Sequence, residues 1–324
     1  MRRVKRIIEL LAPPVLVYLY KWLIHSLLNK KTSNETPNDG KAEGEFKFIS
    51  TMDAHKKRGD TLLILGNGPS LKQQLENSIH ILTSNPCICV NSFASTDYYE
   101  QIKPCVYVLA DPDNFHAVPR ESIKELVENR WKDINDKTKW NIDLVIPARF
   151  RDSEQLEKIK SNTYINILLY NDIDCKAFSD KKTQFELFNK NELAIPAQTV
   201  LNIAVYLGIF WKYKNVFLLG ADTSWHEDLF LDQKTNLLYL NQNHFYSWKF
   251  YSKKRTLLHE ANDTPQKVHE QFFLFYNVFR LYWLLREYAD FNSVSVYNAS
   301  GKSWIDAFER KSLDEVYNIN NGQI

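Results

Sequence analysis

A short turn directly after an apolar strand carries the residues that are best suited to chemistry. Residues 61–65 fit a buried strand and run into Gly-Asn-Gly-Pro-Ser at 66–70. The two glycines have no Cβ, so backbone N–H groups could approach a ligand closely. Pro69 suits the first turn of a helix, whose positive end attracts anions in nucleotide-binding α/β folds. The spacing is neither G-x-G-x-x-G nor a P-loop, and an ordinary strand–helix turn explains it equally well.

Polar residues also follow other segments with strand character. Such segments alternate with helical ones, which predicts an α/β, Rossmann-like fold: a mostly parallel sheet with helices on both faces. Open sheets of this kind bind ligands at the carboxyl ends of their strands. Asn and Asp also cap helices and make turns, but five along one expected edge favour a site. These five residues are Asn67, Asn91, Asp111, Asp222 and Asn298. The strands are predicted over 61–65, 86–91, 105–110, 144–147, 216–219 and 294–297, and the helices over 120–131, 197–207 and 266–288.

Composition narrows the class of protein. The 324 residues suffice for one large α/β domain or two small ones. With 41 basic and 39 acidic residues, the chain has no overall basic field, so we expect no nucleic-acid partner. Its four cysteines, at 87, 89, 105 and 175, contain no C-x-x-C pair, and buried free thiols are expected.

The N-terminal segment has the pattern of a membrane-associating helix. Basic residues flank an apolar stretch over 7–28, in which polar side chains form one narrow stripe. We expect residues 1–31 to lie on the inner-membrane surface, which makes the protein peripheral on the cytoplasmic face; a single span is the less favoured alternative. Residues 32–58 are predicted to form a linker. Residues 59–324 are predicted to form a nucleotide-binding domain with a lid insertion at about 223–263.

Several of these segments together resemble a known family. The stretches are 66–72, 89–93, 204–208, 219–222, 243–247 and 296–300. In order and rough spacing they resemble the bacterial sialyltransferases that use CMP-activated nonulosonic acids, over about residues 61–310. They also resemble a related domain found in motility-associated glycosyltransferases and an archaeal hydroxymethylpterin diphosphokinase.

The resemblance implies roles for particular residues. It implies that Asp222 lies at the floor of a donor site and that His244 deprotonates the acceptor hydroxyl, because an imidazole titrates near physiological pH. A tyrosine hydroxyl would stabilise the departing phosphate, with Tyr239, Tyr246 and Tyr251 as candidates. The residues expected to hold cytidine monophosphate are Asn67, Gly68, Ser70, Asn91, Asp111, Asn298, Ala299 and Ser300.

Two departures from the family pattern leave alternatives open. The sialyltransferases carry a second histidine where this chain has Ser247 or Trp248, so His226 or His259 could be the base instead. Where the family has asparagine, this chain has Asp111, followed by Pro112 and Asp113. The resemblance requires no cofactor, but this D-x-D could bind Mg²⁺ or Mn²⁺ or simply form a turn.

These observations favour a glycosyltransferase. It would move sialic acid or a related acidic sugar from a CMP donor to a surface glycan or a lipid-linked acceptor. One alternative is a Mg²⁺-dependent pyrophosphoryl transferase of the hydroxymethylpterin diphosphokinase kind. Another is a non-catalytic nucleotide-binding protein of envelope assembly, which an intact clustered pocket would count against.

Overall fold

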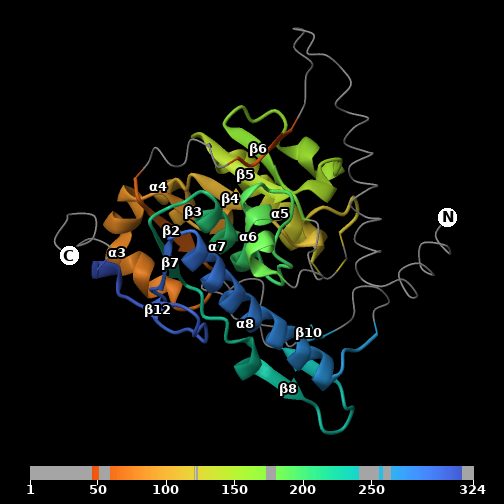
Figure 1. Ribbon diagram of the computed structural model, residues 1–324. Helices are drawn as coiled ribbons and strands as arrows, with labels where there is room; N and C mark the ends of the chain where they lie inside the picture. The colour runs from red at the N-terminus through yellow and green to blue at the C-terminus, as the bar shows by residue number, and fades with distance from the viewer. Residues whose placement is uncertain are drawn as a thin grey trace, which may run out of the picture.

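The computed structural model describes residues 46–50, 59–119, 121, 123–172, 180–240, 255–257 and 264–315. Within them, nine strands form one sheet in which every neighbouring pair is parallel (Figure 1). The predicted α/β class is confirmed. Across the sheet the order is β1 (Lys47–Phe48), β6 (Ile165–Tyr170), β5 (Ile142–Pro147), β4 (Val106–Val108), β3 (Cys87–Val90), β2 (Thr61–Leu65), β7 (Asn215–Leu219), β11 (Ser295–Asn298) and β12 (Glu309–Arg310).

The central strands are buried on both faces, which explains their unbroken apolar sequences. Alternate residues enter two separate cores, as the twofold period of a strand requires. In β2, Leu62 and Ile64 join one core, whereas Leu63 and Leu65 join the other. Two layers of helices must therefore cover the sheet.

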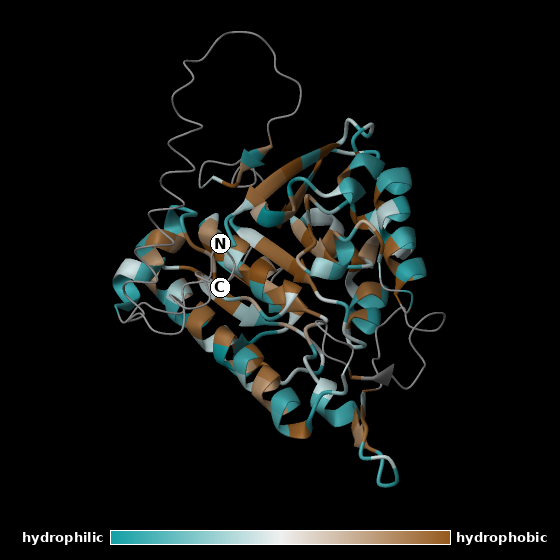
Figure 2. Ribbon diagram, turned by 90° about the vertical axis from the view of Figure 1, so that its right-hand side faces the viewer, coloured by the Kyte–Doolittle hydropathy of each residue, from teal (hydrophilic) through white to brown (hydrophobic). Residues whose placement is uncertain are grey.

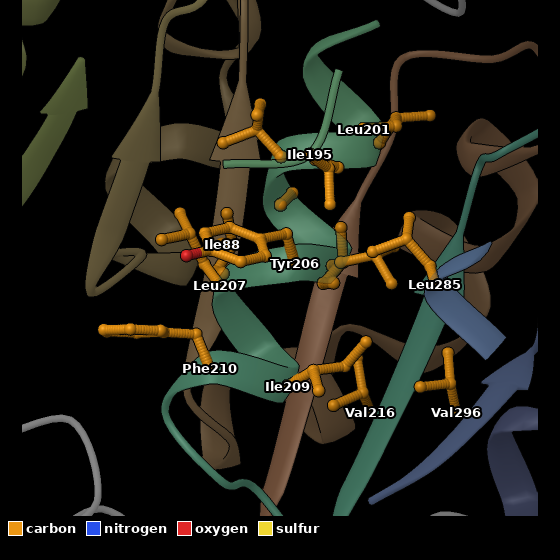
Figure 3. Packing of buried hydrophobic residues seen from close by; sticks show 14 of the residues in the cluster. Ile88, Ile195, Leu201, Tyr206, Leu207, Ile209, Phe210, Val216, Leu285 and Val296 are labelled. Carbon is orange, nitrogen blue, oxygen red and sulfur yellow. The ribbon is translucent and has the colours of Figure 1, made fainter. Parts of the chain in front are cut away.

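The helices divide between these two faces, as predicted. One face is covered by α3 (Leu71–Ser84), α4 (Tyr98–Ile102) and α5 (Lys124–Lys137). The other is covered by α6 (Lys181–Asn189), α7 (Val200–Phe210) and α8 (Val268–Phe291). Ten of the eleven residues of α7 are buried, and Figure 3 shows Leu207 and Ile209 packed among Val216 and other side chains of the sheet. Helix α7 begins at a capping box between Thr199 and Asn202, which satisfies its first backbone donors.

The order of the strands places a topological switch point between β2 and β7. From β2 the chain adds β3, β4, β5 and β6 on one side, and then returns to place β7 on the other side of β2. Connections thus leave these two neighbours in opposite directions. Such a switch point opens a crevice at the carboxyl ends of the strands, where ligands bind in open α/β sheets.

A second, small sheet lies beyond this edge. Strands β8 (Leu229–Leu231), β9 (Leu238–Leu240) and β10 (Arg255–Thr256) pair antiparallel. They fall within the range predicted as a lid. Figure 2 shows the start of α8 and the β8–β9 hairpin at one end of the molecule.

The sequence prediction omitted some elements. The edge strands β1 and β12, strand β6 and helix α6 were not predicted. Within the described residues, no helix is both long enough and apolar enough to cross a membrane. The predicted N-terminal helix of residues 1–31 and most of the linker lie outside the described residues.

Candidate functional site

A cavity of about 950 Å³ lies at the carboxyl ends of the central strands. Four of the five predicted strand-end residues line it: Asn67 after β2, Asn91 after β3, Asp111 after β4 and Asp222 after β7. Gly68 lines it as well. Pockets of roughly 300–1,000 Å³ suit small-molecule ligands, and this one is large enough for a nucleotide bearing a sugar.

The two asparagines join neighbouring strand ends. The Asn67 side-chain amide donates to the Val90 carbonyl oxygen over 3.0 Å, which ties the end of β2 to the end of β3. Asn91 has a φ of +52°, a left-handed conformation that asparagine tolerates well. Its carbonyl oxygen accepts from the Tyr107 hydroxyl. Its buried side-chain oxygen has no hydrogen-bond partner in the described part of the chain. Asn91 therefore offers an acceptor to a ligand.

Asp222 occupies the position where the sequence suggested a bound anion. Its carboxylate accepts from the Ser70 backbone N–H over 3.2 Å and from the Ser70 hydroxyl over 2.7 Å. The positive end of α3 is thus faced by the protein's own carboxylate. Burial raises the pKa of Asp222, and the two hydrogen bonds from Ser70 partly offset that rise. Ser70 itself does not appear among the residues that line the cavity, so its predicted contact with a nucleotide remains a prediction.

The glycines of the first turn have a role that the sequence did not indicate. A Cβ on Gly66 would lie 2.4 Å from the Gly220 carbonyl oxygen. A Cβ on Gly68 would lie 2.1 Å from the Asp222 carboxylate and 2.6 Å from that same carbonyl oxygen. Two hydrogen bonds also join the turn after β2 to the end of β7, from Gly66 N to Leu219 O and from Gly68 N to Gly220 O, each 2.8 Å long. The glycines allow the ends of β2 and β7 to touch, so a larger residue at 68 would disturb the fold as well as the site.

Asp111 is held in a short, well-anchored turn. It caps the 3₁₀ turn η3 (Pro112–Asn114) by accepting from the Asp113 backbone N–H over 3.0 Å. Asn114 donates to the Asp111 carbonyl oxygen, and the Trp131 indole of α5 donates to the Asn114 carbonyl oxygen over 2.8 Å. Asp113 is buried and is not among the lining residues. Among the described residues, no three His, Cys, Asp or Glu side chains gather in a way that could hold a metal ion.

The segment after β11 lies at a different cavity. Asn298, Ala299 and Ser300 line a second hollow of about 420 Å³, together with residues of α3 and the end of the described chain. The Asn298 amide donates to the Ile305 carbonyl oxygen over 3.0 Å, and the Ser300 hydroxyl accepts from the Ala221 N–H over 2.9 Å. These residues support the turn that carries Asp222. The structure does not bring them to the larger cavity.

Two ion pairs in the lining were missed by the sequence analysis. Arg149 Nε lies 3.1 Å from the Asp172 carboxylate, and Lys302 pairs with Glu227. Burial raises the pKa of Asp172, and Arg149 partly lowers it. Glu227 raises the pKa of Lys302. Asp172 follows β6 as the other polar residues follow their strands, so recognition of β6 would have revealed it.

The far end of the cavity is apolar. It is bounded by α7, α8 and the small sheet, and Gln271 is a buried polar residue within it. A side-chain amide in an otherwise apolar wall can hydrogen-bond a ligand and so fix its orientation. Apolar lining residues at this end include Val200, Leu201, Ile203, Trp225, Leu240, Leu257, Leu274, Phe275 and Val278.

Most of the candidates for the base and for the tyrosine that stabilises the phosphate lie outside the described residues. His244, His259, Tyr246 and Tyr251 lie outside the described residues, so their roles remain predictions. His226, in the 3₁₀ turn η6 (Trp225–Asp228), packs edge-on against Trp304 with ring centres 4.2 Å apart. Neither His226 nor Tyr239 is among the residues that line the cavity.

Comparison with known proteins adds a distant structural likeness. No protein-family model and no curated protein matches this chain. The structure is similar to that of the MAf glycosyltransferase from Magnetospirillum magneticum AMB-1, with a TM-score of 0.48 and 11% sequence identity. The match covers 84% of this chain and 36% of that one. A likeness at this level assigns no activity, so function must be inferred from the site itself.

Proposed function

We propose that this protein is a glycosyltransferase that transfers an acidic sugar from a CMP donor to a surface glycan or a lipid-linked acceptor. The observation that carries the proposal is the meeting of Asn67, Asn91, Asp111 and Asp222 around one cavity at the switch point between β2 and β7. All four were expected from the sequence to follow strands, and the family resemblance assigns Asn67, Asn91 and Asp222 to the donor site. Their gathering also counts against a purely structural protein.

The two ends of the cavity suit the two substrates. The polar end has an unpaired acceptor on Asn91, which suits the exocyclic amino group of cytosine. It also has two cations, Arg149 and Lys302, that can bind phosphate and carboxylate oxygens if they exchange their present partners. The apolar end suits an acceptor with a hydrophobic part, which agrees with a site of action at the cytoplasmic face of the membrane.

The proposed reaction is a displacement at the anomeric carbon. His244 takes the proton of the acceptor hydroxyl while its oxygen bonds to that carbon. The bond from the carbon to the phosphate oxygen breaks, and cytidine monophosphate leaves with the electron pair. Because the transition state has oxocarbenium character, the protein's contribution is to position the acceptor and to stabilise the leaving phosphate.

Thermal shift with a panel of nucleotides tests the proposal. Cytidine monophosphate should raise the unfolding temperature more than UMP, GMP or AMP, since a ligand at 100 times its Kd stabilises the native state by about 2.7 kcal/mol. The Asn91→Ala variant should lose this response, and Asn77→Ala, at the second hollow, should keep it. An equal response to all four nucleotides would refute the cytidine assignment. A response to ATP with Mg²⁺ alone would favour the pyrophosphoryl transferase.

A further inference from the structure

Three aromatic side chains at the start of α8 are exposed on one end of the molecule. Phe272, Phe273 and Tyr276 are 56%, 62% and 58% exposed, and the rings of Phe273 and Tyr276 stack with centres 6.3 Å apart. We call these three residues the aromatic patch. Figures 1 and 2 place the start of α8 and β8 at the same end of the molecule, and β8 carries the half-exposed Phe230. Large apolar side chains gathered in this way mark a surface that binds something.

The aromatic patch is continuous with the apolar end of the cavity. Leu274, which directly follows Phe273 in α8, lines the cavity and is also exposed. Phe275 is buried in the cavity wall, and its ring meets Phe272 edge-on with centres 6.3 Å apart. An apolar molecule held against the patch would therefore lie next to the entrance of the site.

The size of the patch argues against a second copy of the chain as its partner. Three aromatic side chains of roughly 200 Å² each, exposed by a little over half, present about 350 Å². A stable protein–protein interface buries about 800 Å² on each partner. A patch of this size, made of Phe and Tyr, instead matches the side chains that insert at a membrane interface.

The charges around the patch favour an anionic lipid surface. Lys267 precedes the patch, and Arg280 follows it one turn later on the same helix. The one acidic residue in the first turn of α8, Glu270, accepts from the Lys267 backbone N–H over 2.7 Å and so caps the helix. Basic residues beside an apolar patch attract anionic headgroups.

We propose that the aromatic patch docks on an anionic lipid membrane and presents the apolar end of the cavity to it. This contact is separate from the predicted N-terminal helix. It does not depend on the identity of the sugar donor, because the surface binds lipid whether or not the cavity holds a nucleotide. It deepens the proposed function by naming the place where a lipid-linked acceptor would arrive.

Sedimentation with vesicles of phosphatidylcholine and phosphatidylglycerol tests the proposal in the full-length chain. In a background with Leu19, Trp22 and Leu23 changed to glutamate, which removes the predicted N-terminal contact, vesicle binding should persist. Adding Phe272→Ser, Phe273→Ser and Tyr276→Ser should lower the bound fraction about tenfold. The matched control changes Phe48 and Tyr164, exposed apolar residues at the β1 edge of the sheet, to serine and should have no effect.

A fluorescent label gives a readout that unfolding cannot imitate. Cys87, Cys89 and Cys105 are buried, and burial raises the pKa of the Cys87 and Cys89 thiols, so they react poorly. In a Cys175→Ser background, the emission of an environment-sensitive dye attached at Tyr276→Cys should shift to shorter wavelength when vesicles are added. The emission of the same dye at Tyr164→Cys should not shift. The proposal would be overturned if vesicle binding survived the serine changes or if the dye on Tyr276→Cys showed no blue shift. It would also be overturned if the protein were a dimer that dissociated on the serine changes.

Discussion

The Gly66→Ala variant is expected to lose roughly 3 kcal/mol of unfolding free energy, the upper range for overpacking. The added methyl group would lie 2.4 Å from the Gly220 carbonyl oxygen and 3.1 Å from that of Leu219. Both are backbone atoms, of the last residue of β7 and of the residue that follows it, so no side chain can rotate away to make room. The strain would be relieved only by separating the ends of β2 and β7. Urea denaturation followed by circular dichroism measures the loss.

Gly301→Ala provides the matched control. A Cβ there would lie 3.5 Å from the nearest atom, the Ser70 Cβ, which is an ordinary contact. We expect a change within about 0.5 kcal/mol for that variant. If Gly66→Ala were as stable as Gly301→Ala, the close contact between the two strand ends would be wrong.

The largest effect on catalysis is expected from His244→Ala. A positioned general base contributes roughly 10²- to 10⁴-fold, so turnover should fall by that factor. Binding of cytidine monophosphate should be unchanged, because the residues of the polar end remain. Steady-state transfer from a CMP-activated sialic acid, measured beside nucleotide affinity, separates these two quantities.

His226→Ala is the control for that experiment. Its ring packs against Trp304 and does not line the cavity, so its loss should leave most of the turnover intact. Full activity in His244→Ala would remove His244 from the mechanism. A large loss in His226→Ala with normal stability would assign the role of base to His226 instead.

Local sequence predicted the core of the fold because the central strands are buried on both faces. Strands β2, β3 and β7 are unbroken apolar runs that end in a polar residue or a glycine, and such runs are recognisable without their neighbours. The first half of β6 is partly or fully exposed, so its pattern resembles that of a loop. Edge strands β1 and β12 are two residues long and carry no periodicity.

The gathering of strand-end residues at one cavity could be predicted for those that follow the central strands, and their role as a binding site stays a prediction. Asn67, Asn91, Asp111 and Asp222 meet because their strands lie near the switch point. Asn298 ends β11, which lies beyond β7, and it opens on the second hollow instead. The contact of Gly68 with Asp222 joins residues 154 positions apart in sequence, so no local pattern could show that this glycine serves packing.

Hydrogen–deuterium exchange with and without cytidine monophosphate tests the central claim most directly, because it locates the nucleotide. If the larger cavity is the donor site, backbone amides in 66–70, 91–95, 111–115 and 222–224 should exchange more slowly with the nucleotide bound. Amides in 73–78 and 310–314, at the second hollow, should be unchanged. Protection confined to that second hollow, or no protection at saturating nucleotide, would contradict the assignment of the cavity between β2 and β7.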